Sequence, residues 1–187
     1  ATKKDYMKNG FVVEYQIMDF DHDDLADDSG KAPISWDMVA LYKDEIYMKR
    51  NSESSCWDEC DGRTFLNGEF YDNMSDELRA IVKPVWKLTA NKNGEIVKSK
   101  DYVWLKSEKE LYGRTFYSND GEGYWYALFM QENFPWFKLN GDNEKDWQWL
   151  RSVFAGNSYY FCRVYTGGSP SNGSSGFSRG VAPAFCS

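Results

Sequence analysis

The order of local patterns along the chain predicts an α+β fold, in which short helices surround a small twisted antiparallel sheet with much irregular structure. Helix signals come early, and a strand-and-loop region comes late. Between them, residues 117–148 are rich in aromatic side chains but are repeatedly interrupted by Gly and Pro. We therefore expect aromatic packing, rather than periodic secondary structure, to hold this middle region.

The first strand is predicted at residues 11–20, where apolar and polar residues alternate imperfectly. An acidic stretch follows, with Asp at alternate positions as in a calcium-binding loop. However, Asp24 stands where that loop has Gly, and Gly30 stands where it has Glu. We therefore expect a solvated loop without a metal, in which His22 or Asp23 is hydrogen-bonded to the backbone.

Three helices are predicted from caps and spacing. Ser35 can cap a helix that runs to Ile46. Residues 62–71 place their apolar side chains at helical spacing. Ser75 can cap a further helix that ends at Pro84, and the acidic residues after Ser75 suit the positive end of its dipole.

The next elements have stronger local signals. Two β-prone runs, at residues 85–89 and 96–97, flank Asn91-Lys-Asn-Gly94, which is typical of a hairpin turn. Residues 102–105 are predicted as another strand. Ser107-x-x-Glu110 is a capping box, which predicts a short helix directly after it.

Two apolar strands are predicted near the end, at residues 159–164 and 181–186, and they bracket a loop at 166–179. Cys162 and Cys186 lie in these strands and are interpreted as buried small hydrophobic residues, although they can form a disulfide if the strands are neighbours. The four cysteines do not make a disulfide scaffold in a chain of 187 residues. The other two, four positions apart, have no second pair with which to bind zinc.

Length and charge narrow the classes of function. A chain of 187 residues without a linker or repeat favours one domain, at residues 1–187. The net charge is −7, yet residues 152–187 contain two Arg and no acid, so the body is strongly acidic. This argues against nucleic acid as a partner. No apolar run approaches the roughly 20 residues of a membrane helix, and no signal-peptide pattern is seen, so we expect a soluble chain without membrane insertion.

Residues 152–187 contain no Lys, Glu, Gln, Met or Trp, although the preceding chain holds all 6 Met and all 8 Trp. No codon that ends in a pyrimidine specifies any of these five amino acids. The remaining residues are rich in Ser, Gly, Tyr and Asn, a composition typical of binding loops. We interpret this segment as a recognition surface, diversified at asparagine-type codons. The alternative is an ordinary Gly/Ser-rich loop between two strands.

Several short motifs, taken together, are similar to those of a known family. They are Asp21–Asp23, Arg63–Asn67, Trp104–Glu108, Trp149–Ser152 and Gly180–Cys186, with Phe161–Val164 and Gly167. These motifs resemble a bacterial and phage domain of unknown function that is associated with the C-type-lectin fold and is often found in phage structural or surface proteins. The resemblance extends from about Phe11 to Ser187, so it implies a single C-type-lectin-like domain.

Such proteins include the variable proteins of diversity-generating retroelements, in which an error-prone reverse transcriptase rewrites adenines in a C-terminal repeat. Adenine replacement in an AAY codon cannot produce the five missing residue types. The resemblance therefore implies that residues 151–187 are a variable, ligand-binding segment. It also implies display on a phage virion or bacterial cell surface, where the partner is a protein or cell-surface receptor.

In that case some side chains of the segment are buried framework and others form the ligand face. The framework is expected to comprise Trp149, Leu150, Val164, Val181, Pro183 and Phe185. The ligand face is expected to comprise Phe154, Asn157, Tyr159, Tyr160, Arg163, Tyr165, Ser171, Asn172, Ser174, Ser175 and Phe177. Because strand residues alternate between two faces, some of these rings are expected to be partly buried. Arg151 and Arg179 are expected to brace the segment through carbonyls or carboxylates.

A non-enzymatic binder without a cofactor is the favoured function. The single His has no evident nucleophile partner, and Gly-rich phosphate loops and a Gly-x-Ser-x-Gly elbow are absent. One alternative is an invariant structural component of a phage or cell surface. Another is a cysteine-dependent oxidase of the formylglycine-generating type, which has a similar architecture and uses a cysteine pair with which Cys162 and Cys186 can be compared.

Overall fold

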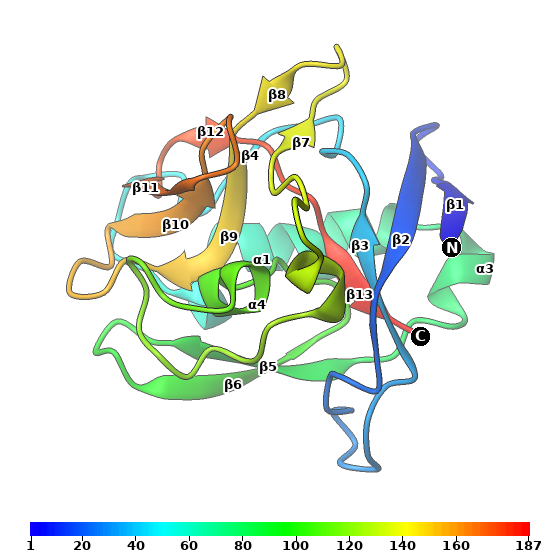
Figure 1. The fold of residues 1–187 in the computed structure, drawn as a ribbon, viewed down its shortest axis with the longest axis horizontal. Helices are drawn as coiled ribbons and strands as arrows, with labels where there is room; N and C mark the ends of the chain where they lie inside the picture. The colour runs from blue at the N-terminus through cyan, green and yellow to red at the C-terminus, as the bar shows by residue number, and fades with distance from the viewer.

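The computed structural model describes residues 1–187 as a mixed α+β fold, made of small antiparallel sheets with few helices. Figure 1 shows the four-stranded sheet on one side, the three-stranded sheet on the other, and a long hairpin beneath the three-stranded sheet. The α+β class predicted from the sequence is confirmed at this level. No helix has the length and apolar character needed to cross a membrane.

The four-stranded sheet joins the two ends of the chain. It has the order β1-β2-β3-β13, with every neighbouring pair antiparallel, and consists of β1 (Thr2–Tyr6), β2 (Val12–Phe20), β3 (Ile34–Met38) and β13 (Ala184–Cys186). The predicted first strand is confirmed as β2. The helix predicted from Ser35 is wrong, because this segment is β3 and pairs on both sides. The Ser35 hydroxyl donates to Asp23, at 2.6 Å, instead of capping a helix.

The three-stranded sheet carries most of the C-terminal segment. It has the order β11-β10-β9 and consists of β9 (Gln148–Val153), β10 (Tyr160–Val164) and β11 (Pro170–Ser174). Two short pairs flank it, β4 (Ile46–Tyr47) with β12 (Ser178–Arg179) and β7 (Lys138–Leu139) with β8 (Lys145–Asp146). The predicted loop at 166–179 is therefore wrong in part, since it contains β11 and β12.

The central hairpin and its neighbouring helix follow the sequence signals. β5 (Val85–Ala90) pairs with β6 (Ile96–Asp101), and the Asn91 side chain accepts the backbone N–H groups of the turn. α4 (Glu108–Tyr112) begins with the predicted capping box at Ser107 and ends at Gly113, whose φ of 76° suits glycine. The strand predicted at 102–105 is reduced to one bridge, between Trp104 and Ala184.

The remaining helices are short. They are η1 (Trp57–Glu59), α1 (Asp61–Phe65), the π-helical η2 (Leu66–Phe70), α2 (Tyr71–Asn73), α3 (Asp76–Arg79) and η3 (Ala127–Met130). The helix predicted at 62–71 is thus present as consecutive helical segments. The Ser75 hydroxyl accepts the N–H of Leu78, at 3.1 Å, so the predicted cap of α3 is confirmed.

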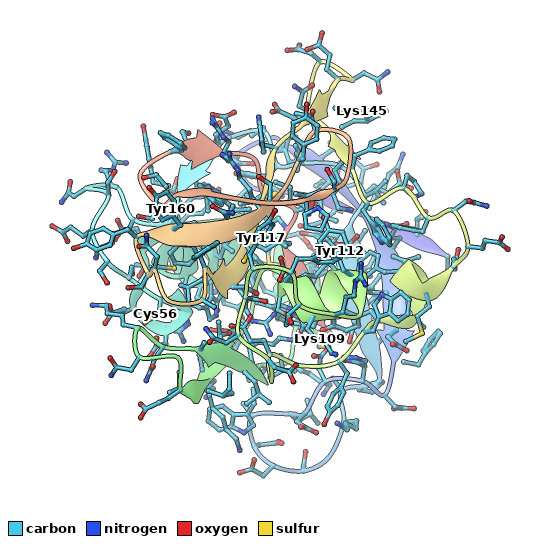
Figure 2. The ribbon with its side chains drawn as sticks, turned by 60° about the vertical axis from the view of Figure 1, so that its left-hand side comes forward. Cys56, Lys109, Tyr112, Tyr117, Lys145 and Tyr160 are labelled. Atoms are coloured by element: carbon cyan, nitrogen blue, oxygen red, sulfur yellow. The ribbon has the colours of Figure 1, made fainter.

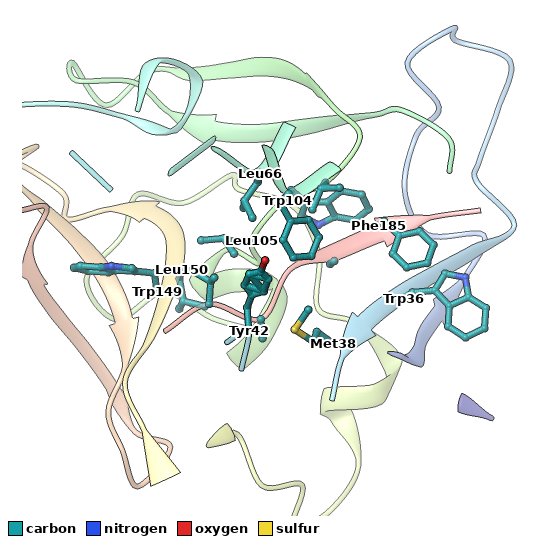
Figure 3. Close-up of a cluster of buried hydrophobic side chains, with 14 of the residues drawn as sticks. Trp36, Met38, Tyr42, Leu66, Trp104, Leu105, Trp149, Leu150 and Phe185 are labelled. Carbon is teal, nitrogen blue, oxygen red and sulfur yellow. The ribbon is translucent and has the colours of Figure 1, made fainter. Parts of the chain in front are cut away.

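The hydrophobic core lies between the sheets and draws heavily on the two C-terminal motifs (Figure 3). The six framework residues predicted from the sequence are all buried. Figure 3 shows Trp149 and Leu150 on one side of the cluster and Phe185 and Trp36 on the other, with Trp104 and Leu105 among them. These residues come from distant segments, so the core closes only when the C-terminal segment is in place.

All four cysteines are free and buried, which confirms that Cys162 and Cys186 act as small hydrophobic residues. Cys162 lies on β10 and Cys186 on β13, strands of different sheets. Burial raises the pKa of both thiols well above the ordinary value. These positions give the cysteine-oxidase alternative no pair of reactive thiols.

A chain of charged side chains crosses the interior. The Arg151 guanidinium forms a bidentate salt bridge with the Glu110 carboxylate, at 2.5 and 3.0 Å. It also donates hydrogen bonds to the backbone carbonyls of Leu105 and Leu88. Lys87 Nζ lies 2.7 Å from Glu110 Oε1 and 2.7 Å from Asp23 Oδ1. Burial alone would raise the pKa of the Glu110 carboxyl, but the charges of Arg151 and Lys87 hold it below its ordinary value. We call Asp23, Lys87, Glu110 and Arg151 the buried ion chain.

The prediction of a solvated loop is therefore wrong at Asp23. Its side chain is 4% exposed and accepts hydrogen bonds from Ser35, Lys87 and Tyr126. The neighbouring His22 ring packs against Tyr126 with the two rings tilted by 30° and their centroids 4.0 Å apart. Asp21, Asp24 and the outer part of the stretch, from Asp27 to Lys31, are exposed as expected. The local pattern did not reveal Lys87, which reaches Asp23 from a strand far along the chain.

Glu122 is a further buried acid beside this chain. Its carboxylate accepts the Ser152 hydroxyl and, at 2.9 Å, the backbone N–H of Ala90. Burial raises its pKa from 4.5 to about 7, although these hydrogen bonds and the charge of Arg151 act in the opposite direction. Glu122 thus links Ser152, near the start of the C-terminal segment, to the central hairpin.

We predict that Glu110→Gln lowers the free energy of unfolding by about 3–5 kcal/mol, because it leaves the buried Arg151 charge without its carboxylate. Urea unfolding would measure this loss. A matched control is Glu59→Gln, which breaks an exposed pair with Lys92 and should cost less than about 1 kcal/mol. Equal, small losses in both variants would show that the buried ion chain does not hold the fold.

A second prediction concerns pH. The folded state retains the Glu122 proton between about pH 4.5 and 7, where the unfolded state releases it. This contribution to stability is complete below pH 4.5 and is lost as the pH rises to about 7, by up to about 3 kcal/mol. Thermal unfolding across this window should show a declining melting temperature that Glu122→Gln flattens. Parallel curves for the two proteins would contradict the assignment. Asp23, Glu110 and Asp37, which is buried and paired with Lys106 and Lys138, have lowered pKa values and lose their contributions only at more acidic pH.

Candidate ligand-binding face

The pairing of β9 with β10 in the three-stranded sheet is irregular. Three residues of β9, at 150–152, lie opposite the single residue Cys162, as in a β-bulge of β9. Along β10, Phe161 and Cys162 are both fully buried, whereas the consecutive Tyr159 and Tyr160 are both exposed. Simple alternation of inward and outward residues, expected from the sequence, therefore fails in this strand.

Most of the predicted face residues are accessible. Tyr159, Tyr160, Tyr165 and Phe177 are 54%, 38%, 47% and 48% exposed. A further group is half-buried: Phe154, Asn157, Arg163, Ser171, Asn172 and Ser174. Whether these residues bind a ligand remains a prediction.

The prediction that Ser175 belongs to the ligand face is wrong, because this residue is completely buried. Its backbone N–H donates to the carbonyl of Tyr159, at 2.9 Å, and its own carbonyl accepts the N–H of Lys49, at 2.9 Å. Its hydroxyl donates to the carbonyl of Glu53, at 3.3 Å. Ser175 therefore fastens the end of β11 to the loop after β4 and is not available to a ligand.

One part of the face combines arginines with aromatic rings. The Arg163 guanidinium carbon lies 3.8 Å from the centroid of the Trp147 ring, which Tyr165 meets edge-on at 5.0 Å. Arg179 lies 5.6 Å from the same Trp147 ring and 5.2 Å from Phe177. We call Trp147, Arg163, Tyr165, Phe177 and Arg179 the arginine–aromatic face. Contacts of this kind are attractive because the ring faces carry partial negative charge.

Trp147 was missed by the sequence analysis because it precedes the segment with the unusual composition. In Trp147-Gln-Trp149, the alternation of strand side chains alone would place both Trp rings on the same face of the sheet. The structure places the two rings in different environments. Trp149 is buried, with its indole N–H donating to the carbonyl of Ile46, whereas Trp147 is only half-buried. Trp147 lies just outside β9, so its direction is not fixed by the strand.

A second aromatic group lies at the other end of β10. Phe154 stacks on Tyr117 with centroids 5.9 Å apart, and its ring meets Tyr160 at 6.5 Å. Figure 2 shows Tyr160 at one end of the β10 ribbon and Tyr117 on a neighbouring loop, while the β7–β8 hairpin, marked by Lys145, projects beyond the sheet. Tyr117 was also missed, because nothing in its local sequence links it to Phe154.

Arg151 and Arg179 were both expected to brace the segment, but the contacts that they make are different. Arg151 does bind carbonyls and a carboxylate, but within the core and not beneath the loop. Arg179 donates only to the adjacent carbonyl of Ser178, at 3.0 Å. Arg151 therefore fixes the start of the segment, and Arg179 is left as part of its surface.

The molecule also has a cavity of about 240 Å³ above the buried ion chain, with Trp86 and Tyr124 in its walls. Lys87 at its base already donates to Asp23, Glu110 and Tyr126. These three charged groups satisfy one another, whereas both ring nitrogens of His22, which also lies in the cavity wall, have no hydrogen-bond partner. The His, Cys, Asp and Glu side chains form no group of three or more that could hold a metal ion.

Comparison with known proteins adds the family. The sequence profile of a domain of unknown function, DUF6273, matches residues 29–186. The chain belongs to this family. No curated protein and no solved structure matches the chain. In this DUF6273 domain the matched region contains the whole arginine–aromatic face and three members of the buried ion chain, while Asp23 precedes it.

Proposed function

We propose that this DUF6273 domain is a non-enzymatic display protein with a C-type-lectin-like fold, whose C-terminal face docks a protein or cell-surface receptor. The observation that carries the proposal is the arginine–aromatic face, where accessible Arg and aromatic side chains gather around the end of β10 and the neighbouring β12. Arg, Trp and Tyr are the residues that dominate binding energy at protein interfaces. The proposed location is a phage virion or bacterial surface.

The arrangement of the scaffold supports this proposal. Tyr159, Tyr165 and Phe177 are about half exposed, so their outer surfaces have no partner within the chain. The strand that carries the segment into the sheet is fixed at Arg151 by buried charges and hydrogen bonds. A rigid support lowers the entropy that binding must overcome, because the contact residues are already held in place.

We further propose that the protein is a variable protein of a diversity-generating retroelement. The outward side chains of residues 152–187 all belong to types that a codon ending in a pyrimidine can specify. Trp147, a type that such codons cannot specify, lies immediately before the segment and supports Arg163 and Tyr165. This is the division expected of a constant platform beneath replaceable side chains, since surface substitutions usually change stability by less than about 0.5 kcal/mol.

The binding function predicts that peptides selected on the wild-type protein from a random-peptide library lose affinity for Tyr165→Ala and Phe177→Ala. We expect at least a tenfold loss, about 1.4 kcal/mol, as for a ring at the centre of an interface. Fluorescence anisotropy would measure affinity. Tyr6→Ala is the matched control, because Tyr6 is 70% exposed on β1, away from the face. Unchanged affinity of the peptides for both Tyr165→Ala and Phe177→Ala would refute the proposal. A large drop in the melting temperature of these variants would instead assign the two rings to the core.

Diversification predicts a pattern of natural variation. Sequences of this gene from one natural population should differ at outward positions such as Tyr159, Tyr165, Asn172 and Phe177, through codons derived from AAY. The codons for Trp149 and Leu150 should remain constant, because these side chains fill the core. Deep sequencing of the coding region would measure this. A uniform segment would favour the invariant structural component instead.

A further inference from the structure

The two arginines of the arginine–aromatic face have no acidic partner. Arg63 and Arg151 contact Asp101 and Glu110 at 2.6 and 2.5 Å, but no carboxylate lies within 4.0 Å of Arg163 or Arg179. Residues 152–187 contain no acid at all, so the segment cannot neutralise these charges by itself. The positive charge of the face therefore has no counter-charge within the chain.

The guanidinium donors are also incompletely used. Arg163 Nη1 and Arg179 Nε are buried and have no hydrogen-bond partner. Arg163 Nε has only a long contact of 3.5 Å with the Ser171 hydroxyl. A buried donor without an acceptor is unfavourable by the desolvation free energy of that donor, and an acceptor supplied from outside the chain would offset this cost.

Local packing holds Arg163 in one orientation. Its guanidinium lies against the Trp147 ring on one side and passes over Gly173 of β11 on the other. A Cβ at Gly173 would lie 2.5 Å from Arg163 Nη1, so a larger residue would displace the guanidinium. Burial lowers the pKa of Arg163, and the nearby charge of Arg179 lowers it further. An anion bound beside the Arg163 guanidinium would oppose both effects.

We propose that Arg163 and Arg179 form a carboxylate-binding site, into which a partner protein inserts an Asp or Glu side chain. This inference rests on the proposed binding function and specifies its partner. A carboxylate can accept paired hydrogen bonds from a guanidinium fork, and the rings of Trp147, Tyr165 and Phe177 can pack against the apolar part of the incoming side chain.

The rest of the molecule favours a single acidic side chain over a polyanion. The chain carries a net charge of −7 even with both arginines included, so a nucleic acid would be repelled by the surface around the face. A protein is favoured over a small acidic sugar because accessible Tyr, Ser and Asn side chains extend the surface well beyond the arginine pair. Such surfaces are typical of protein-binding loops.

The test extends the random-peptide selection to Arg163→Gln and Arg179→Gln. Peptides selected on the wild type should share an Asp or Glu, and replacing it by Asn or Gln should weaken binding at least tenfold. Replacing the acidic residue of the peptide by Asn or Gln should have little effect on binding to Arg163→Gln or Arg179→Gln. In these variants the guanidinium that the carboxylate would bind is already absent. Arg79→Gln is the matched control, since Arg79 lies on α3 and faces Asp72 at 3.8 Å. Melting temperatures would establish that each variant is folded.

The outcomes separate this inference from the proposed function. Peptides that depend on Tyr165 and Phe177 but not on an acidic residue would overturn the carboxylate site and leave the binding function intact. Peptides that depend on none of these residues would overturn both. As a further arm, free glucuronate and N-acetylglutamate amide would compete with a bound peptide. More effective displacement by glucuronate would overturn the choice of a protein partner in favour of an acidic sugar.

Discussion

The paired contact between Arg151 and Glu110 is the constraint on which the rest of the structure depends. Each charge would be unfavourable by several kcal/mol if it were buried alone, so the interior is stable only when the two meet. Arg151 belongs to β9 and Glu110 to α4, and Lys87 extends the contact to β5 and to the loop of Asp23. These contacts fix β9, α4, β5 and the loop of Asp23 relative to one another, although the four segments do not belong to one sheet. They also fix the position of β9 in the three-stranded sheet.

Elements whose signals are satisfied by near neighbours could be predicted from the sequence. The capping box at Ser107 and the hairpin around Asn91 need only partners within four residues, and both are present. Ser35 and Asp23 could not be assigned in this way. Each has a local pattern, a helix cap or an acidic loop, but each is used in the core by residues from distant strands. Long-range pairing overrides local preference where a backbone segment gains a strand on each side.

The candidate face was predictable in composition but not in detail. The unusual composition of the last residues identified Tyr159, Tyr165 and Phe177, which are accessible. It also suggested Ser175, which a return of the chain toward Glu53 buries completely. Composition could not identify Trp147, which lies outside the unusual segment yet contacts both arginines of the face. Membership of a face depends on how neighbouring strands are connected, and that information is distributed over the whole chain.

The pairing of β13 with β3 affects how the domain is made. Trp36 and Ser187 are hydrogen-bonded although they are 151 positions apart, and the buried Phe185 stacks against the Trp36 ring. During synthesis the ribosome must therefore deliver almost all of this region before the interior can close. Contacts of such long sequence separation slow folding and leave apolar surface open meanwhile. A nascent chain that stalls before residue 184 exposes Trp36 and its neighbours, which would mark it for chaperones and proteases.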